Sequence, residues 1–214
     1  MKSWPKYASH EEDMKFRKKK WNEKYNKTRV VMWDDTNIPF RFAPSSALNQ
    51  RISFSLYYNE NCAKGGVFLQ LCGWGGVGDL WSGRISDNDY MELNKIFEEQ
   101  ENFAKKDTLP GEDVLPFTNI LDKGYRVTLL AMKCGNQTVV QPVFSSADLQ
   151  FLAEEVHRSA SVATDRSGNE RKVNHSKLSD FLQRGLRSSS CPTRMNNTWL
   201  SWAFQTNFMY KSVL

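Results

Sequence analysis

Thr28–Asn37, TRVVMWDDTN, is the stretch of this chain that sets the expected fold. Its first half is rich in β-branched and apolar residues, which favour a buried strand. The polar run that begins at Asp34 and ends before Pro39 then predicts that the strand stops. A carboxylate at the end of a rigid strand is held in place yet stays reachable, which suits metal ligation. The same run is also ordinary turn chemistry, so this stretch alone leaves both interpretations open.

Three further apolar stretches follow, separated by Asn-, Gly- or Lys-Gly-containing turns: 51–58 (RISFSLYY), 66–74 (GVFLQLCGW) and 79–85 (DLWSGRI). Short strands joined by short turns predict an antiparallel meander. The glycine run CGWGGVG at 72–78 has no Gly-Lys-Ser/Thr after it and no helix signal. It therefore predicts a hairpin turn rather than a phosphate-binding loop.

Asp122 occupies a position like that of Asp34, because it follows a short apolar strand at 116–121 (PFTNIL). A last strand is expected at 138–144 (TVVQPVF), where Pro142 stops it. Helical patterns are expected at 8–27, 91–106, 125–135, 147–162, 170–186 and 198–214, with a loop at 107–116. This order of elements predicts an α/β fold in which helices flank a mixed sheet.

The length of 214 residues fits one domain and is sufficient to bury a hydrophobic core. A net charge of +5 suits a polyanionic partner without requiring one. The four cysteines form no CxxC pair, and the three histidines complete no zinc spacing, which argues against a zinc site. The N-terminus lacks the apolar run of a signal peptide, and no stretch is long enough for a membrane span. We therefore expect a protein that is not secreted and contacts no membrane.

The basic run FRKKK at 16–20 lies within the expected first helix. It has two interpretations, a nuclear localisation patch or phosphate contact, and a solvated helix face. Under the first, the expected location is nuclear in a eukaryote and cytoplasmic otherwise.

Arg166, Glu170 and Lys177, in DRSGNERKVNHSK, are spaced by four and seven residues. These offsets are close to whole helical turns, so the three side chains share one face of a helix. A carboxylate held between two cations stays ionised and can face a metal ion or a phosphate. A solvated helix face with i,i+4 ion pairs has the same pattern, and only Asp34 and Asp122 upstream favour the first interpretation.

Together these motifs resemble the DDE transposase and endonuclease superfamily, which has a ribonuclease H-like fold. The spacing of Arg166, Glu170 and Lys177 is similar to the YREK signature of bacterial insertion-sequence transposases. The overall layout looks most like the endonuclease domain of PIF/Harbinger transposons, over roughly residues 28–210. The tyrosine of YREK falls on Ala163, and Asp35 replaces the usual glycine after the first aspartate. The resemblance divides the chain into a basic helical arm at 1–27 and a nuclease-like domain at 28–214.

The resemblance implies that Asp34, Asp122 and Glu170 are catalytic and bind two Mg²⁺ or Mn²⁺ ions, with DNA as the substrate. It implies that Arg166 and Lys177 contact DNA phosphates. Asp35, Asp87 and Asp89 compete for a role. Asp35 is expected in the turn, facing the opposite side if the strand continues, and the other two in a helix N-cap region near the site.

The protein partners considered are a separate DNA-recognition protein and a second copy of the chain. Only about thirty residues precede the first aspartate, too few for a recognition module of ordinary size. Two function classes therefore stay open, an active nuclease or transposase domain and a catalytically silent DNA-binding or protein-interaction module on the same fold.

Overall fold

The computed structural model describes residues 6–26, 28–41, 46–143, 152–177 and 192–209. Within these residues a seven-stranded mixed sheet forms the centre of the molecule, with strand order β2-β3-β1-β6-β7 and with β4 and β5 both paired to β3. The strands are β1 (Arg29–Pro39), β2 (Phe54–Ser55), β3 (Glu60–Gln70), β4 (Gly75–Val77), β5 (Trp81–Ser82), β6 (Phe117–Ile120) and β7 (Thr138–Val140). β1 is antiparallel to β3 and parallel to β6, which is parallel to β7. The expected α/β class with a mixed sheet is confirmed.

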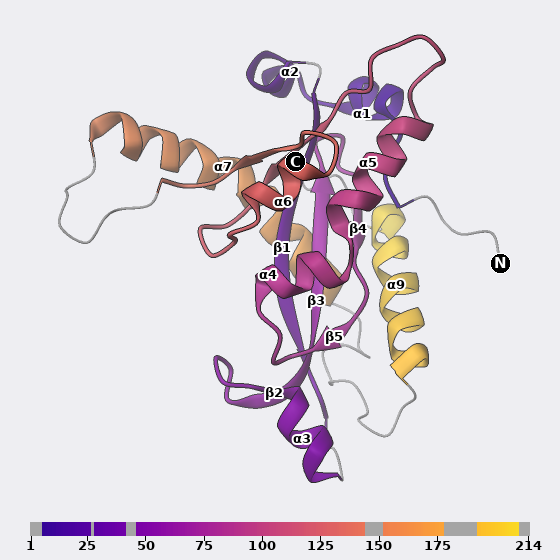
Figure 1. Ribbon diagram of the computed structural model, residues 1–214, viewed down its shortest axis with the longest axis vertical. Helices are drawn as coiled ribbons and strands as arrows, with labels where there is room; N and C mark the ends of the chain where they lie inside the picture. Colours follow the sequence, from indigo (N-terminus) through magenta and orange to yellow (C-terminus); the bar gives the residue numbers. More distant parts are fainter. Residues whose placement is uncertain (1–5, 27, 42–45, 144–151, 178–191, 210–214) are drawn as a thin grey trace.

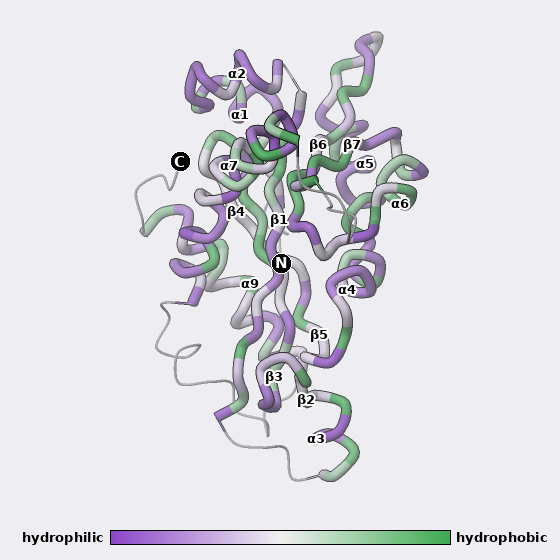
Figure 2. Tube along the Cα trace, turned by 90° about the vertical axis from the view of Figure 1, so that its left-hand side faces the viewer, coloured by the Kyte–Doolittle hydropathy of each residue, from purple (hydrophilic) through white to green (hydrophobic). Residues whose placement is uncertain are grey.

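Helices cover both faces of this sheet (Figure 1). One face carries α4 (Asp87–Leu93), α5 (Ile96–Lys106) and α6 (Thr128–Lys133), and the other carries α7 (Ala153–Lys177) and α9 (Pro192–Met209). Alternate residues of β1 enter the two cores, because successive side chains of a strand point to opposite faces. Val31 and Trp33 pack with the α4–α5 side, whereas Val30 and Met32 pack with Val162 of α7. Figure 2 shows the hydrophobic segments following the central strands, while α2 is mainly hydrophilic.

The expected meander is shorter than the sequence indicates. Most of 51–58 is not a strand, because α3 (Ala47–Ser53) extends into this segment. The Ser46 side chain caps the N-terminus of α3 by accepting from the Asn49 N–H. Only Phe54 and Ser55 pair with β3. The hairpin turn predicted in the glycine run is present, since the Gln70 N–H donates to the Trp74 carbonyl at 2.7 Å. The returning strand is β4 inside that run, and the expected 79–85 strand shrinks to β5.

The helix expected at 8–27 is two helices, α1 (His10–Phe16) and α2 (Lys19–Tyr25). Arg17 breaks it, because its backbone is extended (φ −68°, ψ 137°) while its buried side chain pairs with Asp13. This segment is docked on the rest of the molecule: the Cys72 N–H donates to Asp13 at 2.9 Å, and Trp21 enters the core beside Val30.

The remaining helices follow the expected order. The 91–106 helix is two, α4 and α5, because Lys95 between them has φ +50°. The helices expected at 147–162 and 170–186 are one continuous α7 over their described parts, while 147–151 and 178–186 lie outside the described residues. The last helix begins earlier than expected, at Pro192, a residue well suited to a first helical position.

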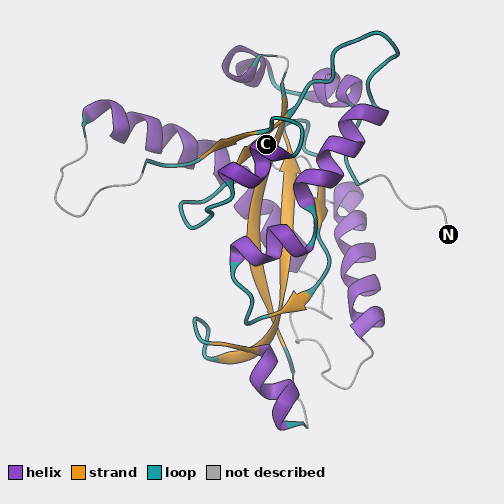
Figure 3. Ribbon diagram, viewed as in Figure 1, coloured by secondary structure: helices purple, strands orange, loops and turns teal. Residues whose placement is uncertain are grey.

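The connections were predicted better than the meander. Residues 107–116 form the long loop expected between α5 and β6, drawn in teal in Figure 3. Gly135, with φ +71°, follows α6 where the helix was expected to end. No helix among the described residues has the length and apolar character needed to cross a membrane.

Candidate functional site

Asp34 does not lie at the end of a strand, which corrects the expectation from sequence. β1 continues to Pro39, and Asp34 pairs with Val67 of β3 in its middle. On the other side of β1, however, pairing with β6 ends at Met32 and Ile120. Among the described residues, Asp34 therefore lies just beyond the carboxyl end of the parallel neighbour, where ligands commonly bind in α/β sheets.

Asp122 reaches the same place from the neighbouring strand, because it follows the last residue of β6 by two positions. Arg166 of α7 joins the two aspartates. Its Nη1 donates to the Asp122 Oδ1 at 2.9 Å, and its Nη2 lies 3.9 Å from the Asp34 Oδ1. The Arg166 side chain is only 13% exposed, so it forms a shielded bridge between segments far apart in sequence.

Glu170 and Lys177 belong to the same charge neighbourhood. The Glu170 carboxylate contributes to raising the pKa of Asp34, and burial lowers the pKa of Lys177 while the nearby Asp34 carboxylate opposes that shift. Within the described residues the ion pairs of Arg166 reach Asp122 and Asp34, not Glu170 one turn along. Arg166 therefore does not form the i,i+4 ion pair that a solvated helix face would have.

The electrostatics of Asp34 reflect this crowding. Burial raises the pKa of Asp34 to about 6, Arg166 lowers it, and the carboxylates of Asp122 and Glu170 raise it. Burial is therefore the main reason why the charged form of Asp34 is unfavourable, and Arg166 is the strongest charged neighbour acting in the opposite direction.

No set of three or more His, Cys, Asp or Glu side chains within the described part of the chain is arranged to hold a metal ion. Arg166 takes the place of a cation between two of the three expected ligands. The donor chemistry nevertheless suits a hard divalent ion, because all three groups are carboxylates.

Asp35 faces the opposite side of the sheet, as expected if the strand continued, but it lies within β1 rather than in a turn. Both of its carboxylate oxygens are shielded from solvent and accept no hydrogen bond of ordinary geometry from the described residues, although the buried Tyr125 hydroxyl lies near enough to lower the pKa of Asp35. Burial and the Asp87 carboxylate raise its pKa well above the ordinary value, while Lys64 acts against them. A side chain at Gly66, the residue that pairs with it, would clash, since a Cβ there would lie 2.9 Å from Asp35 Oδ1.

Asp87 and Asp89 lie in the first turn of α4, as expected for an N-cap region. Ser86 accepts from the Asp89 N–H, and the Asp87 Oδ1 lies 2.6 Å from the Lys64 ammonium. Asp87 is therefore a close charged neighbour of Asp35, whereas Asp89 belongs to the helix cap.

A cavity of about 500 Å³ opens beside the two aspartates and contains residues that the sequence did not single out. Asp34 and Asp122 line it together with Tyr57, Tyr58 and Arg84. The tyrosines were missed because 51–58 was assigned to a buried strand, in which aromatic residues are expected. Their adjacency directly before Asn59, a turn-forming residue, was the available signal.

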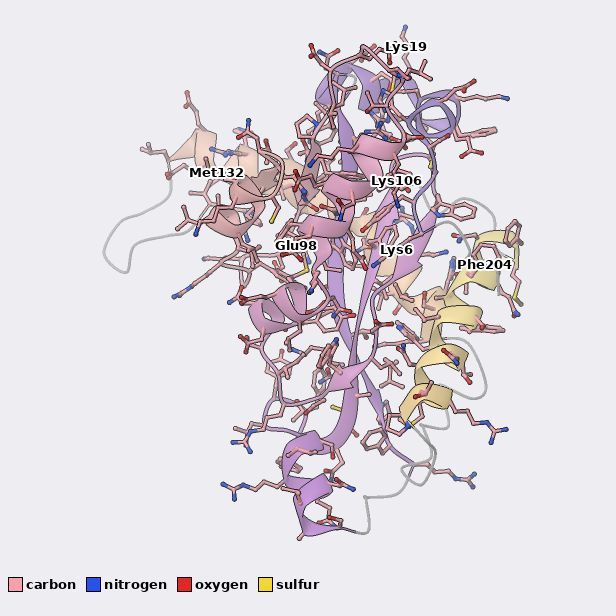
Figure 4. All side chains as sticks on the ribbon, turned by 45° about the vertical axis from the view of Figure 1, so that its right-hand side comes forward. Lys6, Lys19, Glu98, Lys106, Met132 and Phe204 are labelled. Carbon is pink, nitrogen blue, oxygen red and sulfur yellow. The ribbon has the colours of Figure 1, made fainter. Side chains whose placement is uncertain are left out.

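The basic run at 16–20 is divided between two environments. Arg17 is buried and paired with Asp13, so it serves the fold. Lys18, Lys19 and Lys20 are exposed, and Lys19 projects outward in Figure 4. The exposed charge of this run therefore comes from its lysines.

Comparison of the chain with protein-family models, characterised proteins and solved structures finds no match.

Proposed function

We propose that this chain is a divalent-metal-dependent DNA endonuclease or transposase domain of the DDE type on a ribonuclease H-like fold. The observation that carries the proposal is the bridge from Arg166 to Asp34 and Asp122, with Glu170 close enough to act on the pKa of Asp34. Carboxylates from two distant segments thus act electrostatically on Asp34, which supports the proposal. The antiparallel pairing of β1 with β3 and its parallel pairing with β6 fit the proposed fold.

In this proposal Asp34, Asp122 and Glu170 hold two Mg²⁺ or Mn²⁺ ions. When bound, such ions activate the attacking oxygen and stabilise the leaving oxygen of a phosphodiester. With such ions offsetting the charge of Asp34 and Asp122, the planar fork of Arg166 would be available for a DNA phosphate. Lys177 adds a positive charge beside Asp34.

The alternative is a catalytically silent module that binds DNA or a partner protein. The position of Arg166 favours it, because a guanidinium already offsets the charge of two of the three carboxylates. Under either function, a separate DNA-recognition protein or a second copy of the chain would supply further contacts.

Plasmid nicking in Mg²⁺ or Mn²⁺ tests the proposal with three proteins: the wild type, Glu170→Gln, and Glu154→Gln as the matched control. Glu154 is an exposed glutamate in the first turn of the same helix. Loss of a residue that only supports a metal ligand lowers activity by roughly 10- to 100-fold. Glu170→Gln should lower the nicking rate by more than this, and Glu154→Gln should leave the nicking rate unchanged. Nicking that survives Glu170→Gln would remove the assignment of the site. A wild type that binds DNA but never nicks it would favour the silent module.

A further inference from the structure

The β2–β3 turn presents unusually exposed aromatic side chains. Tyr57 is 87% exposed and Tyr58 is 53% exposed, and Leu56 beside them is 84% exposed. Single exposed apolar residues are normal on protein surfaces, but three consecutive ones on a projecting turn form a contiguous patch. Such a patch needs a partner.

The two tyrosine rings are held in a defined arrangement. Their centroids are 4.8 Å apart with an interplanar angle of 74°. The turn that carries them is fixed on both sides, because Phe54 pairs with Asn61 and the Ser53 hydroxyl lies 2.8 Å from the Asn61 Oδ1. Asn59 closes the turn with φ +55°, a conformation that asparagine tolerates well. The backbone on either side of the two rings is therefore held in place, and the rings contact each other.

The same rings line the cavity that contains Asp34 and Asp122. Its volume of about 500 Å³ lies within the range of small-molecule and nucleotide sites. Arg84, which is exposed, provides a cation at the cavity wall. One cavity thus combines flat aromatic faces and the cations Arg84 and Lys64 with the carboxylates of Asp34, Asp35, Asp87 and Asp122.

We propose that this cavity receives an unpaired nucleotide of the DNA substrate, with its base stacked on one of the two tyrosine rings, since the rings stand at 74° to each other, and with its phosphate near Arg84. The inference rests on the proposed function and specifies its substrate class, DNA that carries unpaired nucleotides next to the reacting phosphodiester. Bases within a duplex are stacked on each other and cannot offer their faces to a protein ring, whereas unpaired bases stack on aromatic side chains whatever their sequence. The carboxylate and arginine groups of the cavity fit a polar nucleotide better than an apolar peptide.

Fluorescence anisotropy with Ca²⁺ as the divalent ion tests the inference. Two DNAs of equal length are compared, a full duplex and a duplex with a short unpaired stretch that carries 2-aminopurine. The measured quantity is the ratio of the two affinities, since repulsion by the carboxylates acts on both DNAs. The wild type should prefer the DNA with unpaired nucleotides by about 5- to 150-fold, the range that stacking of one base provides. The 2-aminopurine fluorescence should fall on binding.

Three variants separate stacking from other effects. Replacing both Tyr57 and Tyr58 by Ala should abolish the preference and the fluorescence change, while replacing both by Phe should keep them, because the rings rather than the hydroxyls stack. Phe16→Ala, which removes an aromatic side chain that is 64% exposed on α1, should keep the wild-type ratio. Thermal unfolding checks that each variant is folded.

A wild type that binds both DNAs equally, or that binds neither, would overturn the inference, as would a double Ala variant that keeps the preference. These outcomes are distinct from a failure of the proposed function. Glu170-dependent nicking without a preference for unpaired DNA would leave the nuclease standing. A preference that depends on the tyrosines in a protein that never nicks DNA would leave the nucleotide site standing.

Discussion

Asp34→Asn should make the metal-free protein more stable at neutral and alkaline pH. Asp34 lies in a crowd of negative charge, and burial together with two neighbouring carboxylates raises its pKa from 3.8 to about 6 despite Arg166. An asparagine has nearly the same shape and carries no charge. The substitution therefore removes an unfavourable ionisation and leaves the second aspartate paired with Arg166 at 2.9 Å.

The magnitude follows from the difference between the folded and unfolded states. A rise of about 2.2 pKa units, at 1.36 kcal/mol per unit, is worth about 3 kcal/mol at most. The Asp34 side chain is 28% exposed, so solvent screening reduces the expected gain to roughly 1–3 kcal/mol. Because the folded pKa is the higher one, the wild type is relatively stable below pH 3.8 and loses stability as the pH rises through about 6.

Urea unfolding in EDTA at pH 4.5, 6 and 8 measures this effect. The advantage of Asp34→Asn should grow across this series and level off above the pKa. Asp113→Asn, at an exposed position in the 107–116 loop, is the control and should stay within about 0.5 kcal/mol of the wild type at every pH. A loss of stability in Asp34→Asn at pH 8, or an equal effect at all three values, would refute the electrostatic reasoning.

Two other buried charges give predictions of opposite sign. Burial lowers the pKa of Lys172 to about 8, so the folded state holds fewer protons than the unfolded state between that value and 10.5, and wild-type stability should rise through this window. Lys172→Met removes the buried charge, so it should abolish this rise and stabilise the protein at pH 7 by up to about 3 kcal/mol. Asn207, which accepts from Lys172, keeps a partner in the variant because it also accepts from the Gly75 N–H at 2.9 Å. A destabilised variant in urea unfolding would contradict this prediction. Asp165→Asn should instead cost about 1–3 kcal/mol, since this buried carboxylate joins Lys24 and Tyr25 of α2 to α7; an unchanged midpoint of unfolding would show that this link contributes nothing.

The parts of the fold that the sequence predicted well carry strong local signals. The apolar cores of β1, β3 and β6 and the loop at 107–116 lie where the patterns placed them. The 51–58 segment was misassigned because its alternating aromatic and polar residues also fit a helix end followed by an exposed turn. Ser46, which caps α3, lies outside that segment, so the signal for the helix was not in the residues that indicated a strand.

The sequence placed three residues of the candidate site on one helix but did not indicate their contacts. The spacing of Arg166, Glu170 and Lys177 correctly placed all three on one helix, α7. The ion pairs of Arg166 depend on the tertiary structure. No spacing within α7 indicates that Arg166 contacts Asp34 of β1 and Asp122 after β6. The position of Tyr57 in the cavity was not predicted, because the sequence indicated a strand at 51–58 whereas residues 56–59 form a turn.

The end of β6 explains why Asp34 still lies just beyond the carboxyl end of a parallel strand, although the local prediction for β1 was wrong. The sequence indicated that β1 stops at this aspartate, yet β1 continues and it is the neighbouring strand that stops, with Ile120 opposite Met32. Either event exposes a carboxylate at the carboxyl end of the parallel strands. Because β1 continues, it also turns Asp34 and Asp35 to opposite faces of the sheet, toward Arg166 and toward Lys64 respectively. A strand that stopped at Asp34 would leave Asp35 in a solvated turn. The continuation of β1 therefore buries the Asp35 carboxylate and gives Asp34 and Asp35 different charged neighbours.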